Sequence, residues 1–232
     1  MVWCIFLISG DRSGNKRDML KTFLSDAVQK DAKIITGAKV IRICHEIDCH
    51  GKRKANGVEV LLAGKKLLFR SKRCVVVSTG SLNTPCLLKR SGFTNPHIGK
   101  HLHLHPVVGL GASFDHNINS YFGAPMTVAY KGISMGVNGD GYGPFLECPS
   151  LHSGLAGANG FEWKSAFEFR KEALALNNIA SLIVLQRDKG EGTITADADG
   201  NPVVHYTVEK NDAVNMIKGM ISFTITFCKI LF

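Results

Sequence analysis

The sequence predicts a mixed α/β fold from three patterns in its N-terminal part. Residues 16–30 repeat apolar side chains at helical spacing, which predicts an amphipathic helix packed on a sheet. Residues 33–70 hold short β-branched runs separated by single glycines, as in a small antiparallel meander. Residues 74–78, CVVVS, are uninterruptedly apolar, as in a strand buried on both faces of a parallel sheet. The strands expected in the meander are Lys33–Thr36, Lys39–His45, Gly57–Leu62 and Lys65–Arg70.

A glycine turn and a short helix are expected directly after the apolar run. Thr84 is a suitable N-cap with Pro85 at the first helical position, and Gly92 can end the helix in a left-handed conformation. The turn before it contains Gly80. Because ligands in open α/β sheets bind beyond the carboxyl ends of the strands, this turn is either a ligand contact or a tight structural turn.

A second, mostly antiparallel layer is expected to begin near Pro106. Its glycine-rich loop spans residues 132–143, and Asp212 is expected to cap a last helix that runs toward Met220. The other expected elements are strands at 107–114, 126–130, 179–187 and 203–208 and a helix at 161–176.

The charge and cysteine content limit the classes of partner and compartment. The formal net charge is +9, and its basic clusters at 52–54, 65–66 and 72–73 are interpreted as solvated loop tips, not as a nucleic-acid track. An anionic ligand or a membrane surface fits this charge equally well. Seven cysteines at irregular spacing indicate a reducing, intracellular compartment. The terminal runs 1–8 and 221–232 are too short to span a bilayer, and no signal peptide is recognised.

Two groups of histidines are candidates for a metal site. Cys44-His45 and Cys49-His50 crowd four ligands together without the distant second pair of a structural zinc site, so no zinc is expected there. In an extended strand His101, His103 and His105 would share one face at roughly 7 Å spacing, too far apart for one metal at about 2 Å from each nitrogen. A polar strand face or the wall of a ligand pocket are the alternatives, and no metal is predicted.

A resemblance to a known family indicates a function that the motifs and their spacing alone do not. No dinucleotide-binding glycine fingerprint, P-loop or nucleophile elbow is found. However, residues 80–92, GSLNTPCLLKRSG, followed by Asn95-Pro96, Ile98-Gly99-Lys100 and Leu102–Pro106, closely resemble the glucose-methanol-choline (GMC) flavoprotein oxidoreductases. The LHLHP variant, together with residues 14–18, 36–40 and 123–127, looks like the long-chain (fatty) alcohol oxidases of that family.

This resemblance implies FAD as the cofactor and oxidation of a long-chain primary alcohol to the aldehyde, with oxygen as the acceptor. It implies a Rossmann-like FAD-binding domain, assigned to residues 1–106, and an antiparallel-sheet substrate domain, assigned to residues 107–232. Its site residues, carried over by position, are the Val40 backbone at the adenine, Gly80 and Ser81 against the cofactor, Asn83 and Thr84 beside it, and His101, His103 and His105 as pocket residues.

Two departures from the family shape the functional expectation. The family begins with a βαβ unit carrying a glycine fingerprint and ends with a segment that supplies the catalytic histidine, and neither is recognised here. The chain is therefore expected to be an incomplete oxidase that is inactive alone, with no catalytic residue of its own. The alternative is a non-catalytic remnant that binds a lipid or a partner. Membrane association stays open under either hypothesis.

Overall fold

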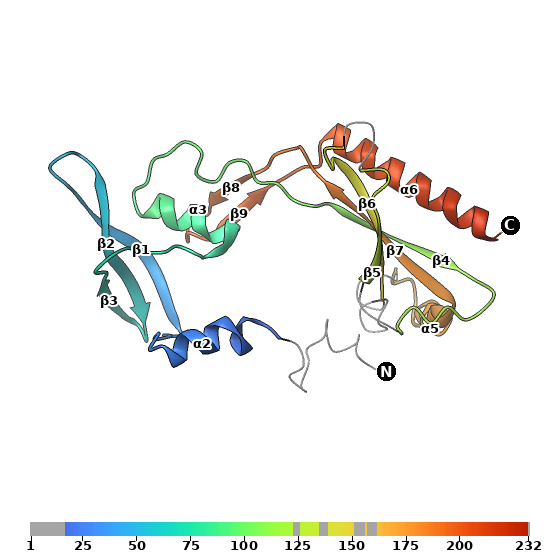
Figure 1. Ribbon diagram of the computed structural model, residues 1–232, viewed down its shortest axis with the longest axis horizontal. Coiled ribbons are helices and arrows are strands. Elements are labelled where there is room, and N and C mark those ends of the chain that lie inside the picture. The colour runs from blue at the N-terminus through green and yellow to red at the C-terminus, as the bar shows by residue number, and fades with distance from the viewer. Residues whose placement is uncertain (1–16, 123–125, 135–138, 151–155, 157–161, 232) are drawn as a thin grey trace. The chain divides into compact units, whose positions relative to one another are not determined.

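The computed structural model describes residues 17–122, 126–134, 139–150, 156 and 162–231 (Figure 1). Contacts divide the chain into two compact units. The meander unit comprises Met19–His103 and Glu191–Thr207, and the sheet–helix unit comprises Leu104–Gly190 and Val208–Phe232 with Met1–Asp18. Helices and strands both occur in the two units, so the predicted mixed fold is confirmed. The Pro106 domain boundary stays a prediction, and the contacts assign residues 191–207 to the N-terminal unit.

The meander unit contains a three-stranded antiparallel sheet in the order β1-β2-β3. Its strands are β1 (Ala38–Ile47), β2 (Arg53–Leu62) and β3 (Lys65–Arg70), so the predicted meander is confirmed. Ala63 and Gly64 connect β2 to β3, and both have positive φ, as a two-residue type I′ hairpin requires. An ideal Cβ on Gly57 would lie 2.3 Å from the carbonyl oxygen of Phe69, so only glycine lets β3 approach this closely.

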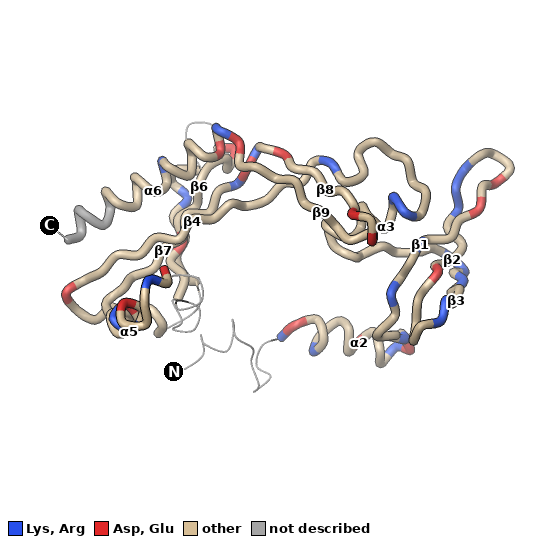
Figure 2. Tube along the Cα trace, turned by 180° about the vertical axis from the view of Figure 1, so that it is seen from behind, with Lys and Arg blue, Asp and Glu red and all other residues tan. Residues whose placement is uncertain are grey.

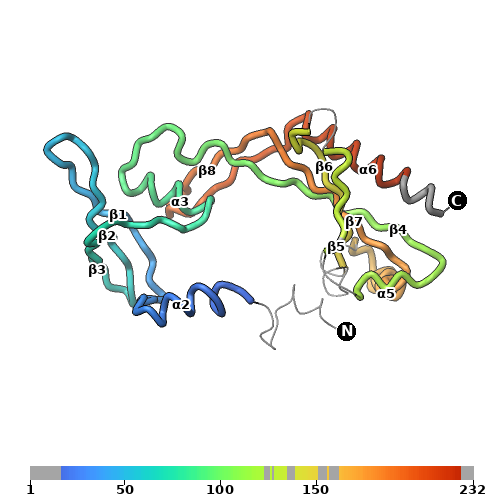
Figure 3. Tube along the Cα trace, viewed as in Figure 1, coloured from blue at the N-terminus to red at the C-terminus, as the bar shows by residue number. Residues whose placement is uncertain are grey.

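Helix α3 (Gly80–Arg90) packs against β1 and against the hairpin formed by β8 (Thr193–Ala196) and β9 (Pro202–His205). Figure 3 shows this hairpin beside α3, although about half of the chain separates them in sequence. Cys86, Leu102 and Ile194 form a buried apolar cluster at this contact. The hairpin therefore supplies part of the core of the N-terminal unit.

The sheet–helix unit is a four-stranded antiparallel sheet with a helix packed on it. The strand order is β4-β7-β6-β5, and α6 (Lys210–Leu231) contacts β6, β7 and β4. Leu146, Leu182, Val184 and Phe223 form its core. Helix α5 (Ala166–Leu174) begins after Ser165, whose hydroxyl accepts the Glu168 N–H. The strands are β4 (Val107–Ser113), β5 (Met126–Tyr130), β6 (Gly143–Pro149) and β7 (Ile179–Arg187), and η2 (Ala175–Asn178) follows α5.

Several expected elements differ from the structure. Residues 74–78 form no strand, and Val76 is 80% exposed. A strand buried on both faces needs neighbouring strands, and the described residues supply none here. Residues 33–36 are also irregular. The helix expected at 16–30 is limited to η1 (Met19–Lys21) and α2 (Phe23–Gln29), and Phe23 is 73% exposed, so the predicted packing on a sheet is wrong.

The C-terminal part of the chain is more helical than expected. Helix α6 starts at Lys210, so Asp212 lies inside its first turn, and the helix continues through residues 221–231. Among the residues with assigned positions, no helix is both long enough and apolar enough to cross a membrane.

Candidate functional site

The N-terminal end of α3 carries four of the residues assigned to the cofactor. The helix begins at Gly80, with Thr79 as its N-cap residue and Pro85 inside it, so the prediction of Thr84 as N-cap is wrong. Instead the Thr84 hydroxyl is hydrogen-bonded to the Thr79 hydroxyl, with 2.9 Å between the oxygens. This contact ties the turn before the helix to its second turn. The helix start is therefore earlier than the Thr-Pro pattern indicated.

Gly80 leaves its backbone open to approach by a ligand. Its φ is +81°, a conformation that favours glycine, and an ideal Cβ there would meet no atom within 4 Å. Ser81 and Asn83 are exposed, and Thr84 is half-buried. The N-terminal end of α3, where the backbone N–H groups have no partner within the helix, is thus accessible to a ligand in the meander unit.

Val40, in β1, lies beside the C-terminal end of the same helix. A bulge at Ile41 interrupts the pairing of β1 with β2. There the Arg90 guanidinium donates to two successive carbonyl oxygens, Nη2 to Val40 at 3.1 Å and Nε to Ile41 at 2.6 Å. The Ile43 N–H donates to the Ser91 hydroxyl oxygen at 2.9 Å. These bonds join the outer edge of β1 to the C-terminal end of α3.

The structure does not bring Val40 next to Gly80. The guanidinium of Arg90 contacts Val40, and Gly80 lies about 15 Å from Arg90 along the axis of the 11-residue helix, at about 1.5 Å per residue. The two predicted contacts lie at opposite ends of α3, where only an extended ligand could reach both.

The three histidines do not form the strand face that the spacing suggested. His101 has a φ of +59°, and only Leu102 forms an isolated bridge, to Gly192, so the expected extended strand is wrong. His105 lies in the sheet–helix unit, whereas His101 and His103 lie in the meander unit.

Glu191 and His97 complete a polar chain around His101. The His101 Nδ1 lies 2.6 Å from the Glu191 carboxylate, and the Nε2 lies 3.0 Å from the His97 Nδ1. The His103 Nε2 lies 3.7 Å from the other carboxylate oxygen. In the part of the chain that the structure describes, no group of three His, Cys, Asp or Glu residues is placed to hold a metal ion. The sequence indicated neither His97 nor Glu191, because residues 97–101 form no helix in which a spacing of four brings side chains together, and Glu191 lies 90 residues from His101.

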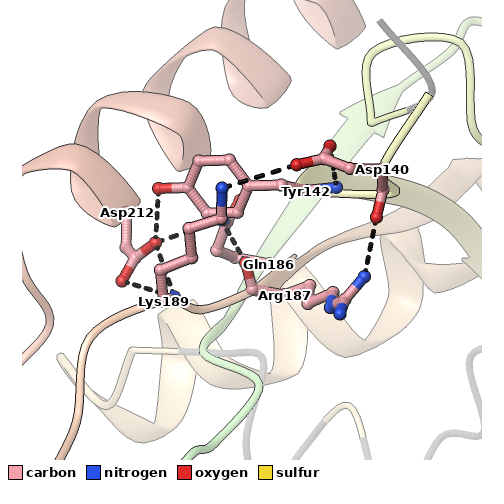
Figure 4. Close-up of polar contacts among 6 residues, drawn as sticks. All are labelled: Asp140, Tyr142, Gln186, Arg187, Lys189 and Asp212. Carbon is pink, nitrogen blue, oxygen red and sulfur yellow. Dashed lines mark hydrogen bonds and ion pairs between the residues drawn. The ribbon is translucent and has the colours of Figure 1, made fainter. Parts of the chain in front are cut away.

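A second polar cluster, missed from the sequence, surrounds Asp212 in the sheet–helix unit (Figure 4). The Asp212 carboxylate is fully buried. It accepts hydrogen bonds from the Tyr142 hydroxyl at 2.8 Å and from the Gly190 N–H at 2.9 Å. The Lys189 N–H donates to both carboxylate oxygens at 3.2 Å. The side chain therefore joins residues 189–190 and Tyr142, which directly precedes β6, to the first turn of α6.

The ionisation of this cluster follows from its hydrogen bonds. Burial acts to raise the pKa of Asp212, but the bonds from Gly190, Tyr142 and Lys189 outweigh it and hold that pKa below its ordinary value. Burial, with the hydrogen bond to Asp212, raises the pKa of Tyr142 to about 12. At neutral pH the carboxylate is charged and the phenol is protonated. This arrangement is structural, because neither group is poised to exchange a proton near neutral pH.

Comparisons with known proteins match both units of the chain. Residues 3–107 match the profile of the GMC oxidoreductase family. The long-chain-alcohol oxidase FAO4A of Arabidopsis thaliana is 30% identical over 227 residues, covering 94% of this chain and 30% of that protein. FAO3 of the same plant, also a long-chain-alcohol oxidase, is 33% identical over 226 residues, covering 91% of this chain and 29% of that protein. An uncharacterized GMC-type oxidoreductase of Mycobacterium tuberculosis is 28% identical over 194 residues, covering 83% of this chain and 29% of that protein.

These matches confirm the resemblance predicted from the sequence. The chain spans about 30% of the length of the curated relatives it matches, so the similarity concerns only that part of each relative.

Proposed function

Because this chain is related to the GMC oxidoreductases through residues 3–107 and through its relatives, we propose that it is part of an FAD-dependent oxidase. The reaction is oxidation of the CH–OH group of a long-chain primary alcohol to the aldehyde, with oxygen as the acceptor. The observation that carries the proposal is the similarity to long-chain-alcohol oxidases over more than nine-tenths of the chain. FAD, when bound, supplies the acceptor for the hydride.

The residues at α3 fit a flavin dinucleotide. The open space beside Gly80 lets a planar ring approach the backbone, and the exposed Ser81 and Asn83 offer polar groups next to it. We assign the Val40 backbone to the adenine end, where its carbonyl oxygen already accepts from Arg90 and retains a second lone pair. Thr84 would hold the turn before Gly80 in place through Thr79.

The histidines are assigned to the pocket, not to proton transfer. His101 and His103 flank one carboxylate, that of Glu191, which orients both rings. His105 is kept as a pocket residue of the sheet–helix unit. Intracellular location and peripheral contact with a membrane are further parts of the proposal, since a long-chain alcohol partitions into lipid.

The cofactor assignment is tested by titrating the purified chain with FAD and following the quenching of flavin fluorescence. We expect saturable binding that Ser81→Leu weakens by about tenfold or more, because an added side chain at this exposed position blocks the approach to Gly80. Ser113→Leu makes the same substitution at an exposed position of β4 outside the assigned site, so it is the matched control and should leave binding unchanged. Absence of saturable binding, or equal losses in both variants, would contradict the assignment.

The alcohol assignment is tested in a chimera in which this chain replaces the matching third of FAO4A. Hexadecanol-dependent release of hydrogen peroxide is the expected result. A chimera that retains flavin absorbance yet oxidises no primary alcohol would refute the substrate assignment and would favour a non-catalytic lipid-binding protein.

A further inference from the structure

The positive charge of the chain is concentrated in the three-stranded sheet. Residues 38–73 contain ten Lys and Arg against three Asp and Glu, so they carry +7 of the net +9. Figure 2 shows basic segments along β1, β2 and β3. Lys66 and Arg70 lie within β3 itself, so the interpretation of the basic clusters as loop tips does not account for them.

The pairing register places part of this charge on one face of the sheet. Arg42, Glu59 and Leu68 are cross-strand partners in one row. Cys44, Gly57 and Arg70 form the next row, and Lys66 lies two residues before Leu68 on the same face. Arg42, Cys44, Glu59, Lys66, Leu68 and Arg70 on this face line a groove of about 540 Å³.

The groove has more positive charge than its own carboxylate neutralises. The Arg42 Nε donates to the Glu59 carboxylate at 2.7 Å. This hydrogen bond holds the pKa of Glu59 below its ordinary value against the opposing effect of burial, and the charge of Lys66 acts in the same direction. Within the described ranges no carboxylate lies at ion-pair distance from Arg70 or Lys66. Two cations therefore remain available to an anion.

We propose that this groove binds a phosphate monoester, with Arg70 and Lys66 contacting the phosphate oxygens and Leu68 packing against the carbon atoms of the ligand. The planar guanidinium of Arg70 can donate two parallel hydrogen bonds to phosphate, and the Lys66 ammonium adds a second charge. Leu68 is 52% exposed, so covering it removes apolar surface from water. Leucine offers bases no stacking surface, which disfavours a nucleic acid here.

A soluble metabolite and the headgroup of phosphatidic acid present the same monoester, and the experiment separates them. The purified chain is titrated with glycerol 3-phosphate by calorimetry. In parallel it is co-sedimented with phosphatidylcholine vesicles that contain or lack phosphatidic acid, at one fixed ionic strength because exposed charges are screened by salt. We expect saturable binding in at least one arm. Binding of the soluble monoester alone identifies a metabolite site, whereas dependence on phosphatidic acid identifies a lipid site.

The double variant Lys66→Gln/Arg70→Gln should weaken that binding by about tenfold or more. The matched control is Lys52→Gln/Lys54→Gln, which removes the same charge from the β1–β2 hairpin outside the groove. It should change the dissociation constant by less than about threefold. All four side chains are exposed, and circular dichroism checks that both variants keep the wild-type fold.

Four results would overturn the proposal: no binding in either arm, equal losses in the two double variants, tighter binding of a single-stranded oligonucleotide than of the monoester, or displacement of the monoester by FAD. The last result would assign the groove to the cofactor. Failure of FAD to bind at α3, in contrast, would leave the phosphate groove untouched, so the two proposals fail separately.

Discussion

Asp212 keeps a negative charge at a position with no exposure to water, and such a charge persists only where donors surround it. The donors are Tyr142, which directly precedes β6, residues 189–190, and Gln186 of β7. The sequence around Asp212 indicated a helix cap, because an aspartate before an apolar helical run is typical of one. Its actual partners lie 22 to 70 residues away in sequence, and no local pattern reveals them.

Asp212→Asn should lower the free energy of unfolding by about 2–3 kcal/mol at pH 7, because the new amide turns an N–H group toward backbone donors. Tyr142→Phe removes one donor and leaves the carboxylate bonded to the others, so it should cost about 1 kcal/mol. Urea denaturation followed by circular dichroism measures both. Because the folded pKa of Asp212 is lowered, its contribution is present above its ordinary pKa and disappears as the pH falls below that value. Equal losses in the two variants would contradict this account.

Tyr142 gives a separate prediction at alkaline pH. Its pKa rises from an ordinary 10.0 to about 12 in the folded protein, so its contribution to stability is complete below pH 10. That contribution is lost as the pH rises from 10 toward 12, because the unfolded chain ionises first. The stability difference between wild type and Tyr142→Phe should therefore shrink over this interval. A difference that stays constant from pH 9 to pH 12 would show that the phenol is not shielded.

At the scale of elements, α3 depends on a hairpin that follows it by about half the chain. Ile194 of β8 covers Cys86 on the helix, and both are nearly fully buried. Ile194→Ala should destabilise the meander unit by about 2–4 kcal/mol through the cavity it leaves. It should also raise the labelling rate of the Cys86 thiol, as measured by mass spectrometry after reaction with an alkylating reagent.

The exposed thiols of Cys49 and Cys74 provide the internal reference for this experiment, because their labelling should not change. Val204→Ala, at a position on β9 that is 43% exposed, is the matched substitution outside the cluster. Cys86 labelling that is equally slow in wild type and Ile194→Ala would show that the hairpin does not protect the helix.

The elements found from the sequence share a pattern that is local. Strands β1 to β3 were recognised by their hairpin-sized spacing, their β-branched residues and the glycines between them, and β4 and β7 are long enough to be recognised as well. Strand β8 was missed because four residues carry no periodicity. Residues 74–78 were misassigned for the opposite reason, since a strong apolar pattern does not supply the neighbouring strands that a buried strand needs.

For the whole molecule, a single cut near Pro106 was the simplest prediction from the change in composition along the chain. Contacts divide the chain close to that point, between His103 and Leu104, but then return residues 191–207 to the first unit. A boundary read from composition assumes that each unit is one continuous segment. The same holds for the candidate site. Gly80 and Ser81 were predicted from a local motif, whereas the contact of Glu191 with His101 depends on the return of residues 191–207 to the first unit and was not predicted.

The return of residues 191–207 to the first unit sets an order of events on the ribosome. The Cys86 thiol donates to the Thr195 carbonyl oxygen, and 109 residues separate the two along the chain. At about 5–20 residues per second, the nascent helix waits on the order of ten seconds for its covering hairpin to emerge. During synthesis the apolar face of α3 is thus exposed for that time, and chaperones can bind it. The middle of the chain is translated before the meander unit can finish folding.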